Sequence, residues 1–355
     1  MIHIKKIAVV LLSCGALMLN SCIKEPEPFD QDILDEISKG TDWEIKSFHE
    51  FCSDGKENRP EVYNGNDPLF SGIDPLYTKC RDYDDILSKR ETYQKLLASE
   101  MERINDPENP VDKDTLNLAL IHAAFVGNID KLNQLIKLGA DPDARNDEQR
   151  TALMIAARNA QPESVKALLA AGANPNAKDS SGRTALMLAS GYVFNYLSVK
   201  ELIKAGADVN AKSKEGESAL HMTLTPVGAD ACITCLKDLI DAGADVDVKD
   251  SDESTPLLYA AKDCHYLASK LLVDAGADVN TSNQDGTTPL MYAVYLMPCG
   301  NYALYLLNAG ANPNAKDKNG ASVSYLFEHG NKDSEEREKV RSSLFFARAK
   351  RLFFF

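Results

Sequence analysis

The chain has 355 residues and a formal net charge of −14, with 53 acidic and 39 basic side chains. Because so acidic a chain repels phosphate backbones and anionic head groups, the charge argues against nucleic-acid binding. The length would allow two domains, so the organisation of the chain has to be found in the pattern of its residues.

The N-terminus has the pattern of an export signal. Lys5 and Lys6 give it a basic start, and residues 7–19 form an apolar run that is too short to span a bilayer comfortably. The run ends at Leu19-Asn20-Ser21-Cys22, which resembles the lipobox of bacterial lipoproteins, where the cysteine is lipidated. We therefore expect a signal peptide at residues 1–21, lipidation of Cys22 and a lipid-anchored location in the bacterial cell envelope, at the outer membrane. An ordinary cleaved secretion signal and a retained anchor are the alternatives.

A tether and a helical region separate this signal from the regular part of the chain. Residues 22–40 are acidic and contain proline, which is typical of a tether. Within residues 41–113, the apolar spacing predicts a helix over 77–104, and prolines follow it. We expect this region to cover the core face of the first repeat, because open ends of repeat arrays expose apolar surface. A separate activity of the region is the alternative.

A five-residue phrase of the form Gly-Ala-Asp/Asn-Pro/Val-Asp/Asn occurs six times. Its glycines are separated by 33, 34, 37, 33 and 34 positions. A fixed period of this size indicates a stack of small units rather than one globular core. The six copies begin at Gly139, Gly172, Gly206, Gly243, Gly276 and Gly310.

Each unit carries the signals of two short helices. The residues expected to cap the first helix are Thr151, Thr184, Ser218, Thr255 and Thr288. Pro256 and Pro289 follow at the first helical position, where a missing N–H costs nothing. The glycine of the phrase is expected to supply the left-handed residue that ends the second helix.

These motifs resemble the ankyrin repeat. Thr255-Pro256-Leu257 and Thr288-Pro289-Leu290 match its signature, and His221 stands at the signature histidine, which in the family hydrogen-bonds the turn backbone. The resemblance covers residues 114–330. It implies an all-α solenoid of about six to seven helix-turn-helix units with β-hairpin-like turns and helical caps at both ends. Residues 331–355 are expected to form the C-terminal cap helix and an aromatic tail that packs on the last repeat; recognition by a partner or the export machinery is the alternative for the tail.

The longer units place their extra residues between their two helices, and therefore on one edge of the solenoid. Several cysteines lie at or near this edge, and an even number beyond Cys22 in an exported chain favours disulfides. The candidates are Cys52, Cys80, Cys232, Cys235, Cys264 and Cys299. We expect Cys52 to pair with Cys80, and a bridge between Cys232 and Cys235 within one turn is one option. Free thiols, a zinc site and a redox-active CxxC are the alternatives.

No catalytic constellation is apparent. The sequence has no Gly-rich phosphate loop, His-Glu-x-x-His or Gly-x-Ser-x-Gly, and its histidines are spread over different units. His122 lies beside two alanines, which favours a hydrogen-bonded core histidine over a ligand. We expect a protein that is not an enzyme and that uses no metal, cofactor or small-molecule substrate.

Position-matching to the ankyrin family gives the candidate partner-binding residues. At the turn tips, where they are expected to be exposed, they are Arg150, Arg183, Glu215, Glu217, Asp252 and Asp285. On the exposed side of the first helices they are Arg158, Tyr192, Lys262 and Tyr295. Arginine and tyrosine are enriched in binding hot spots, and the charge of the tips changes from basic in units two and three to acidic in units four to six.

The expected function is a membrane-tethered module that binds another protein through the concave ankyrin surface. The sequence does not name this partner, but the charge of the partner is expected to complement that of the tips. A periplasmic protein that shields an enzyme or neutralises a toxin, in the manner of an immunity protein, is the first alternative. A surface-exposed protein that contacts a host is the second.

Overall fold

The structure is a computed structural model that describes residues 74–106, 108, 111–192, 195–225, 232–296 and 300–329, together with 340, 341 and 344. The chain divides into two compact parts, Met1–Lys89 and Arg90–Phe355, and the residues of helix α4 (Asp74–Ile104) belong partly to each. The predicted signal peptide, Cys22 and tether lie outside the described residues, as does most of the C-terminal region. Within the described ranges, no helix is both long enough and apolar enough to cross a membrane.

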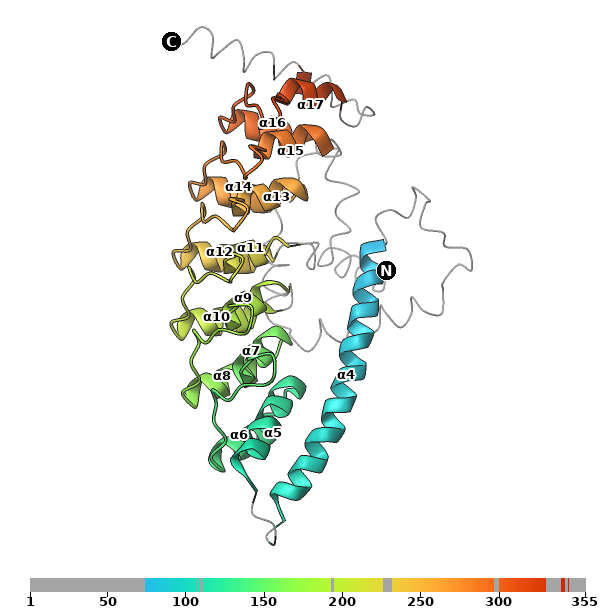
Figure 1. Cartoon of the computed structure of the whole chain (residues 1–355), viewed down its shortest axis with the longest axis vertical. Helices are drawn as coiled ribbons and strands as arrows, with labels where there is room; N and C mark the ends of the chain where they lie inside the picture. The colour runs from blue at the N-terminus through green and yellow to red at the C-terminus, as the bar shows by residue number, and fades with distance from the viewer. Residues whose placement is uncertain are drawn as a thin grey trace, which may run out of the picture. The chain divides into compact units, whose positions relative to one another are not determined.

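In the part Arg90–Phe355, the described residues after α4 form six helix pairs and the further helix α17, and no strand. The pairs are α5 (Lys113–Val126) with α6 (Ile129–Lys137), α7 (Ala152–Arg158) with α8 (Pro162–Ala170), α9 (Ala185–Ser190) with α10 (Tyr196–Lys204), α11 (Ala219–Met222) with α12 (Ile233–Asp241), α13 (Pro256–Lys262) with α14 (Tyr266–Asp274) and α15 (Pro289–Leu296) with α16 (Gly300–Asn308), followed by α17 (Val323–His329). The pairs stack in chain order, with the first helices in one layer and the second helices in another (Figure 1). The all-α repeat architecture that the sequence predicts is therefore confirmed.

The first helices begin at the residues expected to cap them. Thr151 and Thr184 each accept a hydrogen bond on Oγ1, from the backbone N–H of Met154 and Met187, both at 3.4 Å. Thr255 is different, because its hydroxyl makes no cap hydrogen bond. The N–H of Leu258 donates to the carbonyl oxygen of Thr255 at 2.9 Å instead, which tightens the first turn of α13.

The recurrent phrase ends the second helix and also joins neighbouring units. Gly139, for example, has a φ of 95°, and the N–H of Ala140 returns to the carbonyl of Leu135 at 3.0 Å, as in a Schellman motif. The last residue of the phrase then reaches the next copy. Asn176 Oδ1 accepts from the N–H of Asp208 at 2.8 Å, while its Nδ2 donates to the carbonyl of Gly206 at 3.4 Å. In the other pairs of neighbouring units, the side chain at the end of the phrase accepts the equivalent backbone N–H of the next copy. These side chains are Asp143, Asn210, Asp247 and Asn280.

A continuous apolar core fills the space between the two layers. Alanine and leucine dominate the first helices, and all residues from Ala152 to Ala157 in α7 are buried. Leu97 and Met101 of α4 belong to the same core, and Arg90 donates to the carbonyl of Val126 at the end of α5 at 2.8 Å. A second, smaller cluster spans α15, α16 and α17 and includes Val340 and Leu344.

Two equivalent turn positions should respond in opposite directions to substitution. Gly216 and Glu253 both have positive φ, at 77° and 59°, and a Cβ on Gly216 would lie 3.0 Å from the backbone of Asp250. A left-handed backbone costs an L-residue about 1 kcal/mol that glycine avoids. We expect Glu253→Gly to raise the free energy of unfolding by about 1 kcal/mol and Gly216→Ala to lower it by at least about as much. Urea denaturation of both variants checks this, and a loss of stability in Glu253→Gly would contradict it.

Candidate protein-binding surface

The turn tips between units are held in shape by one polar side chain each. Asp179 Oδ1 accepts the backbone N–H groups of Ser181 and Arg183, both at 2.9 Å. Asp250 does the same for Asp252 and Ser254, at 2.9 and 2.8 Å. Asn146, Ser213, Asn283 and Asp317 occupy this position in the other tips. Because these bonds fix the backbone, the residue just before each N-cap is held in a defined position.

Neighbouring tips are also bonded to one another, so that they form a continuous surface. The N–H of Lys214 donates to the carbonyl of Ser181 at 2.9 Å, and the same contact recurs from tip to tip. A row of basic side chains reinforces it: Arg145 Nη1 donates to the carbonyl of Lys178 at 2.6 Å, and Lys178 Nζ to that of Lys212 at 2.9 Å. Lys212 Nζ continues the row to the carbonyl of Lys249 at 2.9 Å. This row was not predicted from the sequence.

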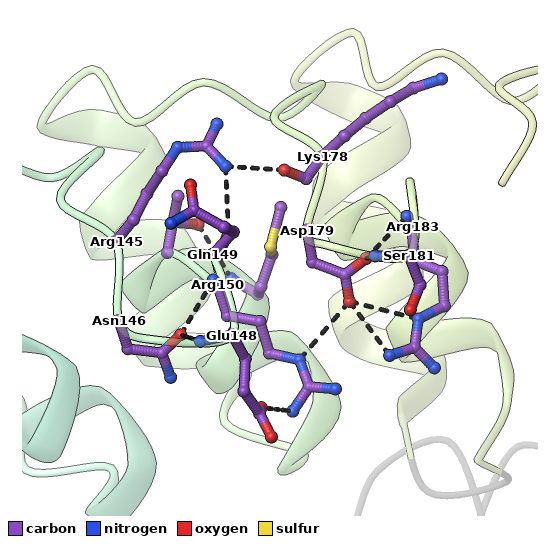
Figure 2. Close-up of polar contacts among 11 residues, drawn as sticks. Arg145, Asn146, Glu148, Gln149, Arg150, Lys178, Asp179, Ser181 and Arg183 are labelled. Atoms are coloured by element: carbon purple, nitrogen blue, oxygen red, sulfur yellow. Dashed lines mark hydrogen bonds and ion pairs between the residues drawn. The ribbon is translucent and has the colours of Figure 1, made fainter. Parts of the chain in front are cut away.

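Two predicted residues, Arg150 and Arg183, meet on one buried carboxylate. Asp179 Oδ2 accepts Arg183 Nε at 3.2 Å and Nη2 at 3.1 Å, and Arg150 Nε approaches it from the preceding tip at 3.5 Å (Figure 2). Arg150 also pairs with Glu148. The side chain of Asp179 is 0% exposed, that of Arg150 12% and that of Arg183 31%. Arg150 was expected to be exposed; this is wrong, because stacking of the tips places it against Asp179, whereas Arg183 keeps an accessible edge.

The pKa of Asp179 reports this pairing. Burial by itself raises the pKa of a carboxyl group, because it disfavours the charged form. Hydrogen bonds from the backbone and side chain of Arg183 and from the backbone of Ser181, together with the positive charge of Arg183, outweigh that effect and lower the pKa of Asp179 below its ordinary value. Asp179 is therefore the charged centre that orders the two arginines.

The tips of units four and five have the opposite charge. The half-buried Glu217 lies near Asp250 and Glu215, and burial, followed by these two like charges, raises the pKa of its carboxyl group. Tyr259 Oη donates to Asp250 Oδ2 at 2.8 Å, and burial together with that bond raises the pKa of the phenol. The change of charge along the tips that the sequence predicts is present, and it falls between the neighbouring positions Arg183 and Glu217.

The remaining predicted residues do not converge on one spot. Arg158, Lys262 and Tyr295 are exposed at the ends of the first helices α7, α13 and α15, and Tyr295 is 52% exposed. Tyr192 is partly buried after α9. Glu215, Asp252 and Asp285 are exposed at their tips, and each accepts a backbone hydrogen bond from the next tip on its carbonyl oxygen. These residues mark an extended surface along successive units rather than a compact site.

Helix α4 covers the corresponding positions of the first unit. His122, which is buried in α5, shares a hydrogen bond of 2.9 Å with Glu100 of α4, and the ring of Tyr93 lies 5.0 Å from the His122 ring and 4.3 Å from that of Phe125. The prediction that His122 is a hydrogen-bonded core histidine is confirmed. Phe125 occupies the position that Arg158 occupies in the next unit, so the exposed first-helix surface begins with α7.

One disulfide candidate pair is bonded in the described residues. Cys232 precedes α12 and forms a disulfide with Cys235, with a Cα–Cα distance of 5.1 Å. Both side chains are buried, which fits a structural bond at the start of this helix. Cys264 is disulfide-bonded as well. Cys52 and Cys299 lie outside the described residues, as does the side chain of Cys80, so the predicted Cys52–Cys80 bridge stays a prediction.

Stacked helix pairs with rigid, mutually bonded turn tips define a helical-repeat scaffold. The family model described as ankyrin repeats (3 copies) matches residues 120–213 and 227–317, more than half of the chain. The chain therefore belongs to the ankyrin-repeat family, whose members are typically non-enzymatic protein-binding scaffolds.

A solved structure gives the same result. The crystal structure of the ankyrin repeat domain of Bcl-3, described as a unique member of the IkappaB protein family, is similar to this chain with a TM-score of 0.51 and 26% sequence identity. The match covers 63% of this chain and 97% of that chain. No curated protein matches the chain.

Proposed function

We propose that this protein is a membrane-tethered interaction module that binds a partner protein along the first-helix side of its ankyrin array. The observation that carries the proposal is the surface formed by the tips and the exposed ends of the first helices. The tips are fixed by hydrogen bonds and include Arg183, while Arg158 and Tyr295 are exposed at the C-terminal ends of α7 and α15. A surface that is rigid before binding loses little conformational entropy in the complex.

The lipobox-like segment that ends at Cys22 supports the tether. A lipid on Cys22, followed by the acidic and proline-bearing residues 23–40, would hold the array at the surface of an envelope membrane and leave it accessible. The location at the outer membrane is part of this proposal. Shielding of an enzyme or neutralisation of a toxin would use the same surface, and the identity of the captured partner distinguishes these roles.

Cross-linking in cells that express the full chain tests the proposal. We expect the wild type to recover a partner from the membrane fraction and a variant with Arg158, Tyr192 and Tyr295 all replaced by alanine to lose most of it, because these side chains supply the hot-spot contacts. A control with Lys137, Lys166 and Lys204 replaced by alanine changes exposed residues of the second helices and should keep the partner. Equal recovery of the partner with the wild type, the triple-alanine variant and the lysine control would overturn the proposed surface. The substitution Cys22→Ser tests the tether, and it should move this protein and its bound partner to the soluble fraction.

A further inference from the structure

Two aspartates occupy the same place in different units of the array. Asp179 opens the tip of unit three and Asp250 that of unit five, and each holds its tip with two backbone N–H groups on Oδ1. The second oxygen, Oδ2, accepts from Arg150 and Arg183 at Asp179 and from Tyr259 at Asp250. The array therefore contains the same aspartate position in two units that differ in the side chains around it.

At Asp179 the array supplies the cations itself. Arg150 reaches Oδ2 from the preceding tip, and Arg183 from the same tip. At Asp250 the residue that corresponds to Arg150 is Glu217, and the residue that corresponds to Arg183 is Ser254. The set Arg150, Asp179 and Arg183 therefore corresponds to Glu217, Asp250 and Ser254, which has two carboxylates and no arginine. Asp250 Oδ2 accepts its hydrogen bond from the neutral hydroxyl of Tyr259.

The neighbouring charges leave this site with an excess of negative charge. Glu215 and Asp252 are exposed on the adjoining tips, and Glu217 experiences the like charges of Asp250 and Glu215, with Arg183 as an opposing influence. Lys212 and Lys249 reduce this excess, but their contacts are with other groups than Glu217 and Asp250: Lys212 Nζ donates to the neutral carbonyl of Lys249, and Lys249 pairs with Glu253 at 3.8 Å. A binding surface with uncompensated charge of one sign selects a partner group of the opposite sign.

The aromatic side chain of Tyr259 is held in place next to the carboxylates of Glu217 and Asp250. Tyr259 packs edge-on against His221, with ring centroids 5.1 Å apart, and His221 is anchored by a 3.0 Å hydrogen bond to the carbonyl of Ser254. An aromatic ring beside a carboxylate suits a guanidinium or ammonium group on an apolar stem. In the part of the chain that the structure describes, no group of three or more His, Cys, Asp or Glu side chains is arranged to hold a metal ion.

We propose that a lysine or arginine side chain of the partner protein binds between Glu217, Asp250 and Tyr259, in the place that Arg150 and Arg183 take at Asp179. This inference rests on the proposed function and specifies the chemistry of the partner. The basic side chain would bridge the tips of units four and five and lay its stem along Tyr259. In the complex, the partner would thereby supply the cation for Asp250, whereas Arg150 and Arg183 of the same chain supply it for Asp179.

Placing an arginine at the position that the repeat itself provides tests the site. Ser254→Arg should pair with Asp250 as Arg183 pairs with Asp179, and we expect it to raise Tm by about 2–4 °C in the full chain. Thr287→Arg is the matched control, because it puts the same side chain at the equivalent position of unit six, where Asn283 replaces the aspartate. An equal Tm for the two variants would show that Asp250 does not accept a guanidinium group and would overturn the inference.

Binding of short random peptides, displayed as a library and selected on the full chain, gives the second measurement. We expect the selected peptides to be enriched in lysine or arginine and to bind Ser254→Arg and Glu217→Gln about tenfold more weakly, while Thr287→Arg binds them as the wild type does. Peptides without basic enrichment, or with unchanged affinity for Ser254→Arg, would overturn the inference. If such peptides still depend on Arg158, Tyr192 and Tyr295, the proposed function stands and this inference alone fails.

Discussion

Asp179→Asn is expected to lower the free energy of unfolding by about 2–3 kcal/mol. The substitution keeps an oxygen that can accept the N–H groups of Ser181 and Arg183, and asparagine already fills this position as Asn146 and Asn283. What it removes is the buried negative charge that Arg150 and Arg183 share. Because Arg150 is largely buried, its guanidinium would then keep only the exposed carboxylate of Glu148 as a charged partner, and reduced compensation of a buried charge is costly.

Urea denaturation at neutral pH measures this loss, and Asp317→Asn serves as the control. Asp317 holds its own tip in the same way, through the N–H groups of Asn319 and Ala321. We expect its replacement to change stability by less than about 0.5 kcal/mol. The cost of Asp179→Asn should also shrink in acid: the pKa of Asp179 is lowered in the folded state, so its contribution is present above the unfolded pKa and is lost as the pH falls through the folded one. A difference that stays constant into acid would contradict the charge-based explanation.

The regular features of the array could be predicted because each depends on neighbours in the sequence. A threonine before an apolar run and a glycine after one determine where a helix begins and ends, and Thr151 and Gly139 do so here. The period of the glycines then shows that the units stack. Even so, the hydroxyl of Thr255 does not cap α13, since the tight first turn has already used the N–H of Leu258.

The Asp179 cluster could not be predicted in the same way, because it joins residues of two units. Read alone, each tip shows an arginine in a polar turn, which suggests an exposed side chain. Only the stacking register places Arg150 over an aspartate 29 positions further along the chain. Asp250 and Tyr259, in contrast, belong to one unit; they are 9 positions apart and meet across the start of α13. A search for oppositely charged residues about one repeat apart would have found the pairing of Arg150 with Asp179.

The irregular fourth unit was predicted in position but not in detail. The sequence indicates extra residues between its two helices, and the structure has a first helix of only 4 residues, Ala219–Met222, before α12. Cys232 and Cys235 lie one turn apart, so the helical geometry of α12 brings them together without help from another unit. Sequence spacing alone left free thiols and metal binding open, since it does not show which side chains are buried together.

His221→Ala is expected to lower the free energy of unfolding by about 2–4 kcal/mol at neutral pH. His221 is 0% exposed and makes the turn contact that the ankyrin signature implies. Its Nδ1 accepts the N–H of Ser218 at 3.1 Å, so Nε2 carries the proton that is donated to the carbonyl of Ser254 at 3.0 Å. The substitution would remove both bonds and leave a cavity beneath Tyr259.

The pH dependence of this loss has a definite sign. Burial lowers the pKa of His221, so the folded state holds the neutral ring while the unfolded chain takes up a proton below its ordinary pKa of about 6.5. The wild type should therefore lose stability as the pH falls from about 7.5 to about 5.5, and the penalty of His221→Ala should narrow over the same range. His221→Gln is the matched control, because glutamine can accept the N–H of Ser218 but does not titrate. A penalty for His221→Ala that is equal at both pH values would contradict a neutral, buried His221.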